Sequence, residues 1–445
     1  MLKLQLKTPM CTGDIDTKSN LIQATGIIGS LRWWTEAILR GMDKFVCDPA
    51  NDDKSDPTRR CPPEKKDGNK KISQYCPACL VFGATGMRRI FRLEISGGER
   101  VFNGGTINIK PKGRKGGWYL GSGIVGKIYS GLISLDREFD EFLVLAPLML
   151  ASKWGGIGAK TQHGYGVVEI EDCPKVDFSG FEKAIEKITN QERLSKLNIV
   201  LRNGNNSGLP DIKDMFFARV RFEADNNEWW KEVDGIAPRS RDNYQGYVND
   251  QRITSWIKSG SVPISPAIKN WLRYKEGRGL WSTGNRNQDE RIENWLFGTT
   301  ERVCATCYGK VSKDRNNPQN FWCKNCRKSF RKEEIFERIA SKINISCAYK
   351  INDNLWGFRI WGWIPNVEDK KGGLLSGFNK DGFLDSLKQA LGGSGLTTIP
   401  WNELLGNQTK SHKLKVWREF NSLRDTVKPD ENNISNYLQS LLEGE

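Results

Sequence analysis

The sequence predicts an α+β protein built from two copies of one unit. Segments in which apolar and polar residues alternate, such as "RIFRLEIS" and "MFFARVRFEA", are typical of half-buried strands. Amphipathic basic helices stand between such strands, as in "SPAIKNWLRYKEG". Both halves follow the order strand, basic helix, aromatic-Phe-Gly turn, strands, helix and glycine loop.

Short similar segments recur at matching places in the two halves. "CLVFGATG" at 79–86 parallels "NWLFGTTE" at 294–301, and "LMLASKWGGIG" at 148–158 parallels "LDSLKQALGGSG" at 384–395. The similarity is one of pattern rather than of strong identity. A chain of 445 residues is also long enough for two or three cores.

We therefore expect a first domain at residues 1–178, a connector at 179–210 and a second domain at 211–445. The first domain opens with an alternating strand and continues into a helix that begins near Ile28. A strand over "RIFRLEIS", a helix at 137–152 and a short strand over "GVVEIE" follow. A helical tail closes the second domain.

The charge balance points to a polyanionic partner. The formal net charge is +15, from 68 Lys and Arg against 53 Asp and Glu. Part of the excess lies in residues 85–118, where only two glutamates accompany Arg88, Arg89, Arg92, Arg100, Lys110, Lys112, Arg114 and Lys115. No apolar stretch approaches the ~20 residues of a membrane span, and the N-terminus lacks a signal-peptide core. We expect a cytoplasmic protein with no membrane partner.

The segment "KWGGIGAKTQHGYG" at 153–166 resembles a phosphate loop but has the wrong spacing. The two glycines that such a loop requires before its Lys-Thr fall on Trp154 and Ala159. A phosphate loop also leads from a strand into a helix, whereas this segment follows a predicted helix and precedes a predicted strand. A nucleotide hydrolase is therefore disfavoured.

Cysteine spacing predicts two structural zinc sites. Cys304-x2-Cys307 and Cys323-x2-Cys326 are separated by fifteen residues, which is the spacing of a four-cysteine zinc ribbon. A second, less regular set consists of the pair Cys76 and Cys79 with Cys47 and Cys61 as single candidates. With four thiolate ligands and no open position, each zinc would be structural and not catalytic.

Three segments could meet a polyanion such as RNA. The first is the helix entry "TGIIGSLRW", where glycines allow close approach and the helix N-terminus offers free N–H groups. The second is the glycine loop, and the third is the basic segment after residue 85. The candidate RNA-binding residues are Gly26, Gly29, Ser30, Arg32, Trp33, Arg88, Arg89, Arg92, Lys160, Gln162, His163 and Tyr165. For Arg32, an alternative is a surface ion pair with Glu36, and for the loop, a plain helix–strand connection.

Catalysis has less support in the sequence. The chain holds only two histidines, and a metal-free ribonuclease would need His163 as general acid or base. Asp14 and Asp16 could position a metal or an attacking hydroxyl, although both also suit a turn. We expect no catalytic residue, with a ribonuclease as the alternative.

These motifs resemble the repeat-associated mysterious protein (RAMP) superfamily of CRISPR systems. The resemblance is carried by "TPMCTGD", "ATGIIGSLRWWTEA", "CPACLVFGATGMRRIFRL" and "GGIGAKTQHGYG", in the family's order. Within the superfamily the chain looks most like the first-numbered subunits of type III-B Cmr effector complexes. The ribbon at 304–326 lies outside the family's core pattern.

The resemblance implies two tandem ferredoxin-like domains, related to the RNA-recognition-motif fold, with zinc-binding insertions. It implies a non-catalytic subunit that binds guide or target RNA near the guide 3′ end in antiviral defence. Its partners would be the terminal and the backbone RAMP subunits. Arg32, Lys160 and His163 are carried over as RNA contacts. A protein–protein adaptor with a merely solvated basic surface remains a further alternative.

Overall fold

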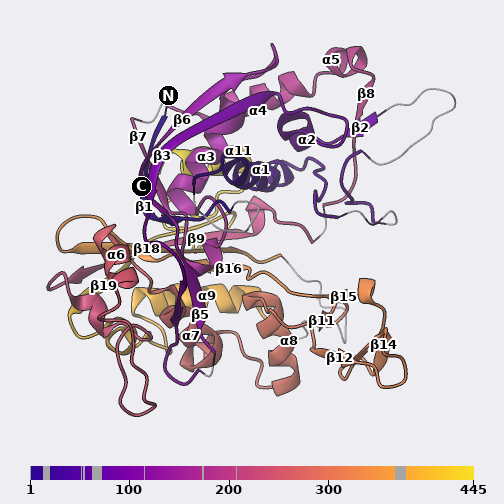
Figure 1. Ribbon diagram of the computed structural model, residues 1–445. Helices are drawn as coiled ribbons and strands as arrows, with labels where there is room; N and C mark the ends of the chain where they lie inside the picture. Colours follow the sequence, from indigo (N-terminus) through magenta and orange to yellow (C-terminus); the bar gives the residue numbers. More distant parts are fainter. Residues whose placement is uncertain are drawn as a thin grey trace.

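The structure, a computed structural model, describes residues 2–13, 21–51, 53, 56–62, 73–114, 116–172, 175–206, 208–365 and 377–444. It is a mixed α/β protein with one main sheet in each half of the chain (Figure 1). The segments with alternating apolar and polar residues form strands of these two sheets. Within its described residues, no helix is long and apolar enough to cross a membrane.

The first half is built on a four-stranded antiparallel sheet with strand order β3-β6-β1-β7. Leu4 of β1 lies opposite Ile128 of β6 on one side and Ile170 of β7 on the other. The sheet strands and the main helices of this half are β1 (Leu2–Met10), α1 (Ala24–Gly41), β3 (Phe91–Arg100), β6 (Ile124–Ser134), α3 (Phe142–Trp154) and β7 (Val168–Glu171).

The second half is built on a six-stranded sheet with order β10-β17-β18-β9-β19, and β16 also pairs with β18. The segment "MFFARVRFEA" forms β9 over its whole predicted length, because its alternating residues face two packed layers. The elements are β9 (Met215–Ala224), α6 (Gln251–Lys258), β10 (Ser261–Val262), α7 (Ser265–Tyr274), α8 (Arg286–Phe297), β16 (Ile343–Ile345), β17 (Ala348–Lys350), β18 (Leu355–Trp363), α9 (Lys380–Gly392), α10 (Trp401–Leu405) and β19 (Thr409–Glu419).

The two sheets share one strand arrangement. In each, the first strand in the chain, β1 or β9, lies between the last two strands of its sheet, which are β6 and β7 or β18 and β19. The similar sequence segments also occupy equivalent places. Gly83 and Gly298 end α2 (Pro77–Phe82) and α8 with φ of 83° and 73°, a conformation that favours glycine. The pattern repeat therefore corresponds to a repeat of topology.

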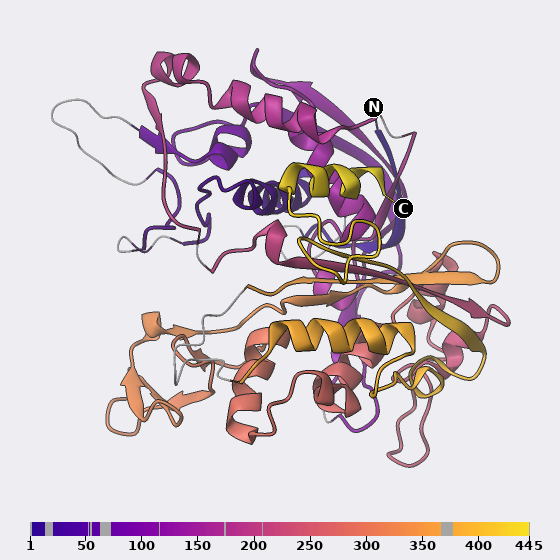
Figure 2. The same cartoon turned by 180° about the vertical axis from the view of Figure 1, so that it is seen from behind.

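The halves exchange packing elements. The hairpin β4 (Thr106–Ile109) and β5 (Trp118–Gly121) places Ile107, Ile109 and Leu120 in the core of the second half. Helix α11 (Ile434–Glu443) ends the chain but packs in the first-half core, where the Trp154 indole donates to the Leu441 carbonyl at 2.8 Å. Figure 2 shows α11 among the first-half helices. The connector predicted at 179–210 therefore separates two halves of the sequence, but elements from each half pack in the core of the other.

The remaining elements belong to the connector and to two insertions. The connector holds α4 (Phe178–Ile188), α5 (Gln191–Lys196) and β8 (Ile199–Leu201), and β8 pairs in parallel with β2 (Ser73–Tyr75). The second insertion projects beyond α8 (Figure 1). Its strands are β11 (Val303–Cys304), β12 (Val311–Lys313), β13 (Phe321–Cys323), β14 (Lys328–Phe330) and β15 (Ile335–Phe336).

Candidate metal sites and nucleic-acid cleft

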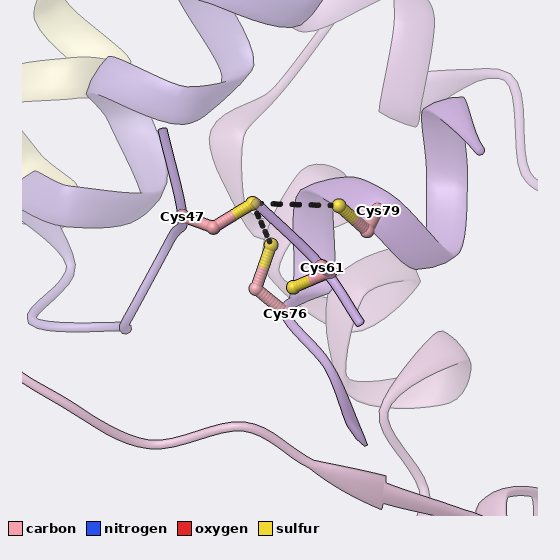
Figure 3. A group of neighbouring side chains, drawn as sticks. All are labelled: Cys47, Cys61, Cys76 and Cys79. Atoms are coloured by element: carbon pink, nitrogen blue, oxygen red, sulfur yellow. Dashed lines mark hydrogen bonds between the residues drawn. The ribbon is translucent and has the colours of Figure 1, made fainter. Parts of the chain in front are cut away.

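The first four cysteines converge beside the N-terminus of α2. Cys76 and Cys79 flank the first turn of this helix, while Cys47 follows α1 and Cys61 lies in the insertion (Figure 3). All four are buried, and their sulfur atoms lie within 4.8 Å of one another. The sulfur of Cys47 is 3.6 Å from that of Cys79 and 3.7 Å from that of Cys76. The irregular spacing in the sequence thus closes into one cluster.

These distances suit a tetrahedral metal and not disulfides. A disulfide joins its sulfurs at about 2.05 Å. A zinc ion with four thiolate ligands at about 2.3 Å separates its sulfurs by about 3.8 Å, which is close to the separations from Cys47. Burial raises the pKa of the Cys76 thiol, so its thiolate form needs a cation beside it. The donor set fits structural zinc.

Three arginines surround this cluster. The Arg32 guanidinium donates to Cys79 Sγ at 3.2 Å and to the Gly83 carbonyl, and it pairs with Glu36 at 2.8 Å. Arg202 donates to Cys61 Sγ at 3.6 Å, and Arg40 donates to the Cys47 carbonyl at 3.3 Å. A zinc ion with four thiolate ligands would carry a net negative charge, which these guanidinium groups would offset.

The ribbon cysteines form the second cluster, again with all sulfurs within 4.8 Å. Cys304 and Cys326 lie 3.8 Å apart, and Cys307 and Cys323 lie 3.5 Å apart. This cluster has its own small core, separate from the two large ones, formed by the cysteines with Val311 and Phe330 packed against them. So little apolar surface cannot order such a segment without the metal.

The glycine loop connects α3 to β7, which confirms the predicted helix–loop–strand order. Its glycines are required by close backbone packing. A Cβ on Gly166 would lie 2.1 Å from the Ile157 carbonyl oxygen, and one on Gly164 would lie 2.5 Å from the Cys347 backbone nitrogen. The alternative of a tight connection therefore accounts for these glycines.

Tyr165 requires a correction. Its side chain is 0% exposed in the second-half core, and its hydroxyl donates to the Gly121 carbonyl at 2.6 Å. An aromatic ring beside polar residues suggests base stacking, but the backbone turns at Gly164, where φ is 99°, and the Tyr165 ring packs against Trp256 while Gln162 and His163 line a cleft. Tyr165 cannot contact RNA in this structure.

Lys160, Gln162 and His163 instead line a large cleft between the halves, which we call the interdomain cleft. Its volume is about 1170 Å³, larger than most small-molecule pockets. The first half contributes the hairpin end and the glycine loop, and the second half contributes α7, α8 and the base of the ribbon. The lining residues central to the argument are Arg114, Trp118, Tyr119, Lys160, Gln162, His163, Lys269, Arg273, Tyr274, Arg278, Arg286, Glu290, Glu293, Glu301, Lys310, Arg338 and Ser341.

The cleft is strongly basic, with eight lysine or arginine residues against three glutamates. Glu293 is held by Arg273 at 3.1 Å and Glu301 by Lys310 at 2.9 Å. Lys160, Arg286 and Arg338 make no ion pair with any described residue. The cleft therefore presents uncompensated positive charge to an anionic ligand.

Aromatic rings accompany these cations. Tyr119 is 63% exposed at the tip of β5. The Arg114 guanidinium lies 3.7 Å from the centre of the Tyr274 ring, in a cation–π contact that joins the hairpin to α7. An exposed ring such as that of Tyr119, beside cations without an ion-pair partner, is a combination that binds single-stranded nucleic acid.

Two titratable groups of the cleft have lowered pKa values. Burial, with the nearby charge of Arg273, lowers the pKa of Lys269 to about 7. Burial, with the charges of Lys269 and Lys160, lowers the pKa of His163 to about 4. His163 is therefore neutral at pH 7, and its Nδ1 has no hydrogen-bond partner among the described residues.

The other predicted RNA contacts lie outside the cleft. Gly26 packs against the Thr12 carbonyl, since a Cβ there would lie 2.8 Å from its oxygen, and Ser30 hydrogen-bonds the backbone of Gly158. Trp33 packs edge-on against Trp34. These contacts and those of Arg32 direct the helix entry into the protein. Gly29 has open space beside it.

The predicted basic segment separates into different environments. Arg88 is exposed, Arg89 donates to the Phe91 carbonyl, and Arg92 pairs with Glu94 at 3.1 Å. None of the three lines the cleft, whereas Arg114 does. Asp14 and Asp16, proposed for a nuclease, lie outside the described residues.

The cleft residues of the second half were not predicted. Lys269, Arg273 and Tyr274 lie in a helix whose amphipathic pattern was recognised, but the sequence does not say what its polar face meets. Arg286 and Arg338 stand far apart in the chain. A basic face on α7 beside buried aromatic residues was the one local signal.

Fold and sites together define a duplicated α+β protein with two four-cysteine clusters and a basic interdomain cleft. Residues 3–169 match the family model of the RAMP superfamily. The first domain is thus a RAMP superfamily domain, which confirms the resemblance that its motifs carry. Comparison with curated proteins gives no match.

Solved structures of Cmr proteins are also similar to the chain. Cmr1 from Pyrococcus furiosus, in its apo form, is 11% identical with a TM-score of 0.32, over 87% of this chain and 95% of that one. A chain of type III-B Cmr-beta bound to cognate target RNA and AMPPnP, in the presence of ssDNA, is 13% identical with a TM-score of 0.34, over 83% of this chain and 96% of that one. A chain of type III-B Cmr-beta bound to cognate target RNA is 12% identical with a TM-score of 0.31, over 82% of this chain and 93% of that one. Because these identities and TM-scores are low, the function proposed below rests on the family match and the cleft.

Proposed function

We propose that this chain is a non-catalytic RNA-binding subunit of a type III-B Cmr effector complex and that it holds single-stranded RNA in the interdomain cleft. The observation that carries the proposal is the lining of the cleft, in which eight lysine and arginine residues meet only three glutamates, with the exposed Tyr119 and the half-buried Trp118 and Tyr274 among them. The RAMP family match supports RNA as the polyanion.

Recognition in such a cleft is independent of sequence. Lys160, Arg286 and Arg338 would bind phosphates, which gives salt-dependent affinity without reading bases. Tyr119 would stack on a base, and every base offers a flat face to stack on. A subunit that serves many guides needs this mode of binding.

The place in the complex follows from the sequence motifs of the first domain, which resemble those of first-numbered Cmr subunits. We infer contacts with the terminal and backbone RAMP subunits near the guide 3′ end. We also infer that both halves are ferredoxin-like, because each places its first strand between the last two strands of an antiparallel sheet.

We further infer that both cysteine clusters hold zinc. The first set would fasten the insertion to α1 and α2, and the second would order the ribbon whose base lines the cleft. When bound, each ion supplies structural cross-links and no chemistry, because four thiolates leave no open position.

RNA binding tests the proposal. Fluorescence anisotropy with labelled oligouridylate should give a salt-dependent affinity for the purified chain. The double variant Lys160→Ala, Arg286→Ala should bind more weakly, and its plot of log affinity against log salt should be shallower by up to about 1.4, since each lost phosphate contact removes about 0.7.

The matched control is Lys183→Ala, Lys187→Ala on α4, which removes the same charge outside the cleft. It should leave the affinity and the salt dependence nearly unchanged. Equal losses in both double variants would mean that RNA is attracted by net charge alone and would overturn the cleft as its site.

A further inference from the structure

We propose that the zinc ribbon carries a second RNA-binding surface, centred on Trp322, that takes the single strand where it leaves the interdomain cleft. This inference rests on the proposed function for the identity of the ligand. The surface, which we call the ribbon face, is the exposed side of the three-stranded sheet β12-β13-β14 together with the turn that joins β13 to β14.

Trp322 lies on this face with its side chain partly exposed. It is 39% exposed, while its neighbours Phe321 and Cys323 are buried on the other side of the strand. Directly across from it lie Ser312 of β12 and Ser329 of β14, both exposed. Because both cross-strand neighbours are small, neither of them can cover the whole indole. A tryptophan with a purely structural role would be packed.

The charge around Trp322 fits a nucleic acid. Residues 302–338 hold ten lysines and arginines against four acidic residues. Lys324, Arg327 and Lys328, in and beside the turn at one end of the face, are exposed and make no ion pair with any described residue. A stacking ring bordered by free cations is the arrangement of single-strand binding sites.

A protein partner fits this face less well. Protein interfaces are enriched in aromatic residues at their centre but depleted in lysine. On the ribbon face a single aromatic ring stands among serines and cations, so there is no apolar patch for a partner to bury. A single-stranded nucleic acid, in contrast, would bind the cations through its phosphates and stack a base on the ring.

The ribbon face is also placed to continue the cleft. Lys310, just before β12, and Arg338, just after β15, both line the cleft. Figure 1 shows the ribbon extending outward from this side of α8. A strand that passes Lys310 and Arg338 as it leaves the cleft therefore meets the ribbon next.

The test uses the full chain, checked for two zinc ions, and a labelled oligouridylate of about 24 nucleotides, longer than the ~4–16 that one compact single-strand domain covers. Trp322→Ala should weaken binding about 5-fold or more, the range for loss of one stacked base, and Trp322→Phe should recover part of it. Phe336→Ala is the matched control, because Phe336 is 40% exposed on the other ribbon sheet. It should change affinity less than twofold.

Site mapping gives a second readout. Photocrosslinking with 5-iodouridine in the probe should label the peptide that contains Trp322, and this label should persist in the Lys160→Ala, Arg286→Ala variant. Unchanged affinity in Trp322→Ala, with loss in the cleft variant, would overturn the ribbon face and leave the proposed function intact. No binding of any probe by the wild-type chain would overturn both. Tighter, Trp322-dependent binding of oligodeoxythymidylate would overturn RNA as the ligand.

Discussion

The ammonium group of Lys269 donates a hydrogen bond to the backbone carbonyl of Gln162, across the junction of the two halves. Lys269 lies on α7 in the second half, and Gln162 lies in the glycine loop of the first. Among the described residues the ammonium forms no ion pair, so it is a buried cation held by a neutral acceptor. This bond joins α7 to the glycine loop within the lining of the interdomain cleft.

Lys269 should make stability depend on pH. Its pKa in the folded chain is about 7, below the ordinary 10.5, so the unfolded chain binds more protons between these values. The free energy of unfolding should therefore rise with pH from about 7 to 10.5, by up to about 1.4 kcal/mol per pH unit from this group. Urea unfolding of the wild type and of Lys269→Met, measured across this window, isolates the effect. Parallel pH profiles for the two proteins would contradict it.

Arg32 should act on zinc rather than on RNA. Its guanidinium donates to Cys79 Sγ, to the Gly83 carbonyl and to Glu36, so each of its three nitrogens is already engaged within the protein. Arg32→Gln should weaken zinc binding at the first site roughly 10–100-fold, as loss of a group behind a metal ligand does. Competition with a chelator measures this, and the ribbon site in the same chain is an internal reference.

Arg88→Gln is the control for that substitution, because the Arg88 side chain is exposed and makes no hydrogen bond to a cysteine among the described residues. It should change neither zinc nor RNA binding. Should Arg32→Gln weaken RNA binding and leave zinc affinity unchanged, the contact predicted from the family resemblance would be restored.

Features that depend on a short stretch of sequence, such as single strands and closely spaced cysteines, could be predicted from the sequence. Strand β9 matches its predicted segment because a run of alternating large apolar residues is a local signal of an extended chain, although the structure buries both faces of this strand. The four ribbon cysteines were found because two CxxC turns at this spacing can close around one ion. The cluster with Cys47 and Cys61 was harder, since its members are brought together by the packing of α1 against α2.

The cleft could not be read from the sequence in the same way. Its walls come from segments around residues 114–119, 160–163 and 269–341, and only the packing of the two halves brings them together. Orientation was the other missing information. Nothing in "QHGYG" says that His163 lines a cleft while Tyr165, two residues on, is buried.

The two metal sites should respond differently to loss of a ligand. Cys76 belongs to the large core of the first half, whereas Cys323 belongs only to the small core of the ribbon. Cys76→Ser should lower the melting temperature of the whole protein and cost about 2 kcal/mol or more. Cys323→Ser should leave that transition nearly unchanged while hydrogen exchange accelerates within 303–338. Each variant should retain one zinc ion per chain. Global unfolding of Cys323→Ser would show that the ribbon is not an independent unit.

His163 should prove dispensable for any chemistry on RNA. Its pKa of about 4 leaves it neutral at pH 7, so it could accept a proton, but the groups beside it are the cations Lys269 and Lys160. They disfavour the protonated form that a general base must pass through, and no described carboxylate hydrogen-bonds its ring to orient it. Labelled oligouridylate incubated with the wild type from pH 5 to 8, with and without magnesium, should stay intact and bound. His163→Ala should behave in the same way. Cleavage by the wild type that disappears in His163→Ala would instead make the cleft a ribonuclease site.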